Sequence, residues 1–158
     1  MERLLAILLL LLLPDIALSQ DIWENKIIKE NIRTVQFSGL DQKDNYPIIK
    51  LGSAQTLWLE FDDLDGELKD YQYTIVHCDF EWKESNLMQN EYIDGIFTEY
   101  ILDNETSFNT YITYTHYKLQ VPNQNLKPKI SGNYILKVFE NGDEEDVVLV
   151  RRFFVYQN

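Results

Sequence analysis

Much of the chain after residue 30 alternates apolar and polar residues with the period of two that is typical of β-strands. In Thr56–Asp62 one face carries Leu57, Leu59 and Phe61, and the other carries polar residues and Trp58. The same criterion predicts further strands at Ile32–Phe37, Ile48–Leu51, Asp70–Asp79, Tyr111–Val121, Asn133–Glu140 and Val147–Tyr156. About seven strands without a long helical period predict an all-β fold, an antiparallel, immunoglobulin-like β-sandwich.

Turn signals separate these strands. Gly66 in the acidic run after Phe61 supplies the conformational freedom of a tight turn, and Asn141–Asp146 is typical of an acidic hairpin loop. The interval Phe80–Phe108 has no sustained period, so we expect one long irregular loop there. Loops of this length inside compact domains often carry function.

The first residues have the layout of a secretory signal peptide. Arg3 precedes the apolar run Leu4–Leu13, and Ala17 and Ser19 place small residues before a cleavage point. We therefore expect a signal peptide over 1–19, a polar leader or short helical turn over 20–30, and a β-sandwich domain over 31–158. Because the last strand ends close to the C-terminus, we expect this domain to be the first of a longer protein.

Composition excludes several classes of protein. A net charge of −12 without a basic stripe argues against nucleic-acid binding and against attraction to anionic membranes. The only cysteine, Cys78, excludes an intramolecular disulfide, a CxxC metal site and a lipidated cysteine at the cleavage point. We expect no direct insertion into a membrane.

Two groups of residues are candidate metal ligands. The acidic run containing Asp62, Asp63 and Asp65 suggests calcium, but aligning Gly66 with the glycine of a calcium loop places apolar or amide residues where carboxylates are required. A solvated hairpin turn is the preferred interpretation. His77, Cys78 and His116 are too few for a structural zinc site.

Neighbouring residues on a strand point to opposite faces, so His77 and Cys78 cannot chelate one ion without a β-bulge. We expect Cys78 to be a buried core residue beside a hydrogen-bonded histidine. Nothing in the sequence pairs Cys78 with His116 as a nucleophile and base, and no phosphate loop or nucleophile elbow is present. We therefore expect neither an enzyme nor a cofactor. The aromatic residues, Trp58 and Trp82 included, suit either a core or a sugar-stacking platform.

Seven segments of the chain resemble, in order and spacing, the N-terminal domain of the type IX secretion system plug protein of Bacteroidetes. The resemblance covers about Ile32–Val155. It rests on Tyr46–Gly52, Leu59–Gly66, Tyr71–Asp79 with Trp82, Tyr92–Gly95, Phe108–Thr110, Tyr114–Tyr117 and Leu126–Tyr134. The resemblance singles out the following positions as structural or interface residues: Asp62, Asp63, Asp65, Gly66, His77, Cys78, Asp79, Trp82, Tyr92, Gly95, Tyr114, His116, Tyr117 and Gly132.

The resemblance implies a non-enzymatic component of the secretion apparatus. Such a protein is expected in the periplasm, held at the outer membrane through its partner, a large β-barrel translocon whose periplasmic opening it occludes. It is also expected to be longer than this chain. The alternative, from the aromatic content and the predicted sandwich, is an exported carbohydrate-binding module.

Overall fold

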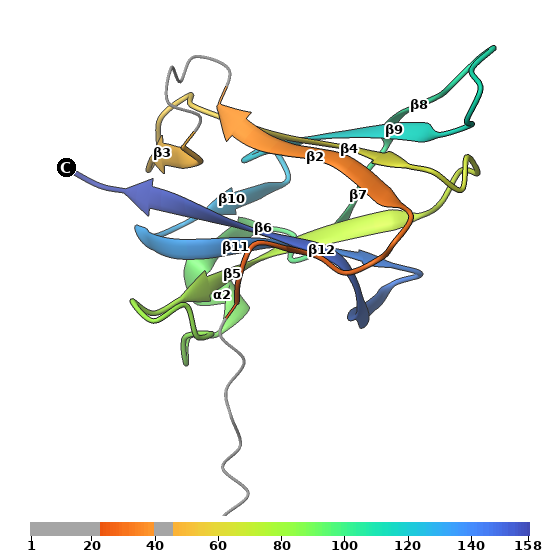
Figure 1. Cartoon of the computed structure of the whole chain (residues 1–158). Coiled ribbons are helices and arrows are strands. Elements are labelled where there is room, and N and C mark those ends of the chain that lie inside the picture. Colours follow the sequence, from red (N-terminus) through yellow and green to blue (C-terminus); the bar gives the residue numbers. More distant parts are fainter. Residues whose placement is uncertain (1–22, 40–45) are drawn as a thin grey trace, which may run out of the picture.

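The computed structural model describes residues 23–39 and 46–158, which fold into two packed β-sheets (Figure 1). The predicted signal peptide over 1–19 lies outside the described residues. Within the described part of the chain, no helix is long and apolar enough to cross a membrane. The only helix in this part is the single turn α2 (Gln89–Tyr92).

The larger sheet has the strand order β1-β12-β11-β5-β7. Its strands are β1 (Lys26–Ile27), β12 (Asp143–Tyr156), β11 (Gly132–Glu140), β5 (Tyr71–Cys78) and β7 (Glu99–Tyr100). All of these pairs are antiparallel, and β3 (Ile48–Lys50) adds a short parallel pair with the end of β12. The long strand β12 thus carries both β1 and β3 on one edge.

The smaller sheet has the order β2-β4-β9-β8 and is antiparallel throughout. Its strands are β2 (Ile32–Gly39), β4 (Leu57–Asp63), β9 (Thr115–Val121) and β8 (Asp103–Thr106). A separate two-stranded ladder joins β6 (Ile93–Gly95) to β10 (Leu126–Pro128). The connection from β4 to β5 crosses from the smaller sheet to the larger one.

The main core lies between the two sheets, where alternate residues of β4, β9 and β5 meet. The rings of Phe61 and Tyr117 stack with centroids 5.2 Å apart, and Tyr71 packs edge-on against Tyr117 at 4.9 Å. These side chains are fully buried. Offset and edge-to-face aromatic pairs of this kind add to the stabilisation that burial alone provides.

β5 is buried on both faces, which explains its nearly continuous run of strand-forming residues. On its outer face, Val76 and Cys78 form a second apolar cluster with Ile135 and Val150. Trp23 and Trp82 pack against this cluster, and the Trp23 amide donates a hydrogen bond to the Trp82 carbonyl at 3.1 Å. Trp23 and β1 are therefore part of the packed domain, and β1 is a strand that the sequence pattern did not predict.

The structure confirms the antiparallel, all-β sandwich and corrects four details. Twelve strands, rather than about seven, lie in residues 23–39 and 46–158. The predicted loop Phe80–Phe108 contains α2 and the strands β6, β7 and β8, because elements of two to four residues are too short to show a period. The strand predicted from Tyr111 begins only at Thr115, and the hairpin loop at Asn141 is shorter than predicted because Asp143 already belongs to β12.

Candidate functional site

The residues that the sequence singled out gather at the two ends of β5, a strand of eight residues that spans about 25 Å. We call the first group the Asp63 end: Asp62, Asp63, Asp65, Gly66, Tyr114, His116 and Tyr117. We call the second group the His77 end: His77, Cys78, Asp79, Trp82, Tyr92 and Gly132. Gly95 lies in β6 opposite Leu126, where a Cβ would stand 1.9 Å from the Asn125 carbonyl oxygen.

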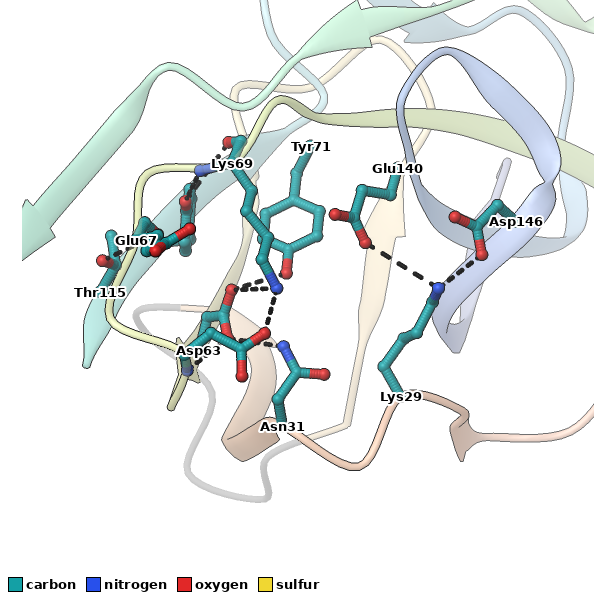
Figure 2. Close-up of polar contacts among 11 residues, drawn as sticks. Lys29, Asn31, Asp63, Glu67, Lys69, Tyr71, Thr115, Glu140 and Asp146 are labelled. Carbon is teal, nitrogen blue, oxygen red and sulfur yellow. Dashed lines mark hydrogen bonds and ion pairs between the residues drawn. The ribbon is translucent and has the colours of Figure 1, made fainter. Parts of the chain in front are cut away.

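Asp63 is a fully buried carboxylate that follows the inward-facing residues Leu59 and Phe61 at the end of β4. Its carboxylate accepts hydrogen bonds from Asn31 at 2.5 Å and from the Tyr71 hydroxyl at 2.9 Å. The Lys69 ammonium lies 3.2 Å away, and Figure 2 shows these three side chains converging on Asp63. A buried charge requires such partners, because an unpaired carboxylate in the core is very costly.

This network fixes the whole connection between β4 and β5. The Asp63 carboxylate accepts a hydrogen bond from the Asp65 amide at 3.0 Å, which closes the turn locally. At the other end of the connection, the Lys69 amide donates to the Tyr117 hydroxyl at 2.8 Å, and the Thr115 hydroxyl donates to the Glu67 carbonyl at 3.2 Å. The turn is therefore tied to the first residues of β9 (Figure 2).

The electrostatics agree with a stable ion pair. Burial acts to raise the pKa of Asp63, but the hydrogen bonds from the Asp65 amide and from Asn31, Tyr71 and Lys69 outweigh it and hold the pKa below its usual value. Burial acts to lower the pKa of Lys69, and its contacts with Asp65 and Asp63 outweigh that effect and raise it. Burial and the neighbouring Asp63 raise the pKa of Tyr71. Asp63 is ionised and Tyr71 is protonated at neutral pH.

The carboxylates of the acidic run are engaged by protein side chains. Asp63 is occupied by protein donors, Asp65 pairs with Lys69, and Asp62 points to the outer face of the smaller sheet. There Asp62 accepts a hydrogen bond from Thr34 and pairs with His116 Nδ1 at 2.6 Å. The prediction of a solvated hairpin turn is wrong for Asp63, because the strand register carries this residue into the core.

A loop of eight residues, 107–114, projects beyond the Asp63 end between β8 and β9 (Figure 1, upper right). Two hydrogen bonds hold its base. The Ser107 amide donates to the Tyr114 carbonyl at 2.8 Å, and the Tyr114 amide donates to the Ser107 hydroxyl at 2.9 Å. Three large apolar side chains of this loop, Phe108, Tyr111 and Ile112, are exposed, and we call them the apolar tip. A hollow of about 490 Å³ at its side is lined by residues that include His116 and Glu105.

The sequence placed Phe108 in a motif and Tyr111 and Ile112 in a strand, and it did not predict the apolar tip. The signal that distinguishes the loop is the run Ser107–Thr110, which contains a serine, an asparagine and a threonine. Such residues favour turns because their side chains bond to nearby backbone.

The His77 end is built around a neutral imidazole. His77 Nδ1 lies 2.9 Å from the Ser85 hydroxyl, and the ring packs edge-on against Tyr134 at 5.1 Å between centroids. Burial lowers the pKa of His77, and a backbone hydrogen bond with Ser131 opposes this only in part. Gly132 has a φ of +155° and faces the ring so closely that a Cβ would stand 2.3 Å from His77 Nε2.

Cys78, Asp79 and Trp82 serve the packing of the larger sheet's outer face. Burial raises the pKa of the Cys78 thiol to about 12, so the thiol stays protonated. The Asp79 carboxylate accepts hydrogen bonds from the amides of Glu81 and Lys83 at 2.8 and 3.0 Å, which shapes the turn after β5. The Trp82 ring lies under the Arg152 guanidinium, 4.3 Å from the ring centroid.

Tyr92 is buried at the end of α2 and contacts the His77 ring, with centroids 5.9 Å apart. Its carbonyl accepts a hydrogen bond from the Lys129 amide at 2.8 Å. Tyr92 therefore attaches the short ladder of β6 and β10 to the larger sheet.

The predicted separation of His77 from Cys78 agrees with the structure, since His77 faces the core between the sheets and Cys78 belongs to the outer cluster. Cys78 and His116 lie on different sheets. In the described part of the chain, no three histidine, cysteine, aspartate or glutamate side chains are grouped so that they could hold a metal ion. These features define a β-sandwich domain in which the polar side chains at the two ends of β5 form hydrogen bonds that fix the adjoining turns.

Residues 32–157 match the family model described as the type 9 secretion system plug protein 1st domain. The chain therefore belongs to this family, which ties it to type IX secretion. A search of the curated proteins gives no match.

Among solved structures, a hypothetical protein from Parabacteroides merdae aligns with a TM-score of 0.81 and 29% identity. The alignment covers 86% of this chain and 34% of the other, so this chain spans about a third of that relative's length. The alkylpurine DNA glycosylase AlkC of Pseudomonas fluorescens aligns over 79% of this chain and 30% of its own, with 10% identity and a TM-score of 0.38. That second likeness supports no inference.

Proposed function

We propose that this chain is the first domain of a periplasmic plug, which binds and occludes the periplasmic opening of an outer-membrane β-barrel translocon. The observation that carries the proposal is the family match, which extends over residues 32–157. The role is non-enzymatic, and the domain acts by its shape and its contacts.

Three features support this proposal. The signal-like residues 1–19 would direct the chain to the periplasm, and the folded domain, which includes Trp23 and β1, would be the first part of a longer protein. Two sheets locked by a buried aromatic core provide a body that keeps its shape in an orifice. A net charge of −12 would steer the domain toward a basic rim.

The test is an affinity purification from the native envelope. The protein carries a C-terminal tag, the envelope is extracted in mild detergent, and co-purifying proteins are identified by mass spectrometry. The expected result is the translocon barrel in stoichiometric amount, together with altered secretion and outer-membrane permeability in a deletion strain. Tagged protein free in the periplasm, with an unchanged secretome in the deletion strain, would overturn the proposal.

A second candidate function is carbohydrate binding, and Trp58 is the observation that favours it. Trp58 lies half-buried on the outer face of the smaller sheet, between hollows of about 250 and 150 Å³. Its indole Nε1 is buried and has no hydrogen-bond partner among the described residues. Binding on a glycan array that is lost in Trp58→Ala would support this function. A blank array would exclude it.

A further inference from the structure

We propose that the apolar tip is the element through which this domain docks, by inserting Phe108, Tyr111 and Ile112 into an apolar socket of a protein whose rim is basic. The inference rests on the proposed function, which supplies the partner, the translocon. It adds the docking surface and the chemistry of the complementary site.

The exposure of the apolar tip is the first argument. Phe108 is 92% exposed, Tyr111 is fully exposed and Ile112 is 63% exposed, and all three lie on one short loop. Leu68 on the adjoining connection adds a fourth exposed apolar side chain at the same end of the sandwich. Apolar side chains that gather on a surface mark interaction sites, and aromatic anchors commonly dominate the binding energy of protein interfaces.

Preorganisation is the second argument. The Thr110 hydroxyl donates to the Ile112 carbonyl at 2.7 Å and lies 3.1 Å from the Ser107 hydroxyl. Asn109 adopts a left-handed conformation, with φ +58°, that lets the chain reverse at the tip. A loop that is already shaped loses less conformational freedom when it binds, which favours affinity.

The Asp63 network gives the loop a firm base. Gly66, with φ +70°, approaches Thr113 so closely that a Cβ would stand 2.8 Å from the Thr113 hydroxyl oxygen. Thr115, which follows the loop, is bonded to the Glu67 carbonyl at 3.2 Å. The network therefore holds the segment from which the apolar tip projects. Because this base is rigid, a partner that binds the tip would hold the whole sandwich in a fixed position.

The charges around the loop select the partner. Glu105, Glu67 and Asp65 are exposed beside it, and Asp62 lines the neighbouring hollow. The ammonium of Lys69 at this end is paired with Asp63 and Asp65. An apolar loop in an acidic surround complements a socket rimmed by lysine or arginine and is repelled by anionic lipid headgroups.

The experiment compares the exposed apolar residues of the tip with one exposed aromatic residue at the other end of the sandwich, in the full-length tagged protein. The test variant is Phe108→Ser, Tyr111→Ser and Ile112→Ser combined, and the matched control is Phe80→Ser, since Phe80 is 87% exposed at the His77 end. We expect the triple variant to recover about tenfold less translocon than wild type at equal expression, and Phe80→Ser to recover the wild-type amount. Circular dichroism and thermal denaturation verify that both variants fold.

A photo-crosslinking amino acid at position 111 is expected to form an adduct with the translocon, whereas the same residue at position 80 is not. Glu105→Lys is expected to weaken recovery more at low salt than at high salt. If wild type and the folded triple variant recover equal amounts of translocon, the inference is overturned and the proposed function remains intact. Wild type that recovers no translocon would overturn both.

Vesicles of phosphatidylethanolamine and phosphatidylglycerol provide the remaining arm. Wild-type protein should stay unbound in a flotation assay. Binding to these vesicles that the triple variant loses would overturn the inference in favour of a membrane-inserting loop.

Discussion

The Asp63 end and the His77 end of β5 each withdraw an ionisable side chain from solvent, Asp63 completely and His77 in part, and the two side chains differ in charge. Asp63 keeps its charge, because Asn31, Tyr71 and Lys69 surround it with donors. His77 is neutral, because partial burial against aromatic rings lowers its pKa and the single backbone hydrogen bond with Ser131 does not offset that effect. A buried group stays ionised only where the chain supplies enough partners to replace water.

The two ends also differ in what they support. The charged network holds a turn and a projecting loop, neither of which has a core of its own. The His77 end packs a short ladder and an outer apolar cluster against the larger sheet. Exposed loops depend on polar contacts for their shape, whereas packed layers depend on close steric fit.

The largest expected effect comes from removing the buried charge. Asp63→Ala leaves Lys69, Asn31 and Tyr71 without their shared acceptor, so the free energy of unfolding should fall by about 3–5 kcal/mol. The matched control is Asp65→Ala, because Asp65 pairs with the same lysine at an exposed position and should cost about 1 kcal/mol or less. Urea denaturation measures both. Equal costs would mean that burial does not distinguish these two carboxylates.

At the His77 end the corresponding break is steric. Gly132→Ala should cost about 2–4 kcal/mol, since it combines an unfavourable φ with a collision against His77 Nε2. Gly52→Ala is the control, because Gly52 also has a positive φ, +69°, and no atom lies within 4 Å of the position that its Cβ would take. This substitution should therefore cost only the free energy of the unfavourable backbone conformation. In a His77→Ala background, the part of the destabilisation by Gly132→Ala that comes from the collision with His77 should vanish. A cost of Gly132→Ala that is unchanged in that background would contradict the close approach.

Cys78 tests the outer cluster beside His77. Cys78→Ser places a hydroxyl among Val76, Ile135 and Val150, and the free energy of unfolding should fall by about 1–3 kcal/mol. Cys78→Ala introduces no polar group and should be the milder change. A thiol reagent should label the native protein only after unfolding, because the thiol is buried and its pKa is raised to about 12. Rapid labelling of the folded protein would show that the cluster is open.

The smallest effect is a difference in pH dependence. The folded-state pKa of His77 lies below its ordinary value of 6.5, so its contribution to stability is present above 6.5 and is lost as the pH falls through the folded pKa. Asp63 also has a lowered pKa, and its contribution is lost only below its ordinary value of 3.8. Between pH 7 and pH 5, therefore, the His77 end should weaken while the Asp63 end holds.

Urea denaturation of wild type and His77→Gln across that interval, which is about two pH units, separates the two ends. The free energy of unfolding of His77→Gln should fall less between pH 7 and pH 5 than that of wild type. The control His116→Gln keeps His77, so its free energy of unfolding should fall as steeply as that of wild type. A His77→Gln protein whose stability falls as steeply as that of wild type would contradict the assignment.

Period-two patterns predicted the long strands well and the short ones poorly. β4 and β9 carry alternating buried residues along their whole length, so the sandwich could be inferred from them. β1, β6 and β7 have two or three residues each, and their strand character comes from a partner that lies far away in sequence. Tyr111 continued the pattern of β9 in sequence and nevertheless lies in an exposed loop, because no neighbouring strand reaches it.

The candidate site follows the same division. The predicted strand ended at Asp62, so the sequence did not assign Asp63 to the buried face that carries Leu59 and Phe61. Its partners could not be inferred either, because Asn31, Lys69 and Tyr71 come from separate segments. Family motifs, turn residues and the sandwich class are local properties that the amino-acid sequence alone determined. The tertiary structure decided which distant side chains pair, that Asp63 is ionised while His77 is neutral, and that the apolar tip is exposed. The reason is that burial and partner geometry exist only once the two sheets are packed together.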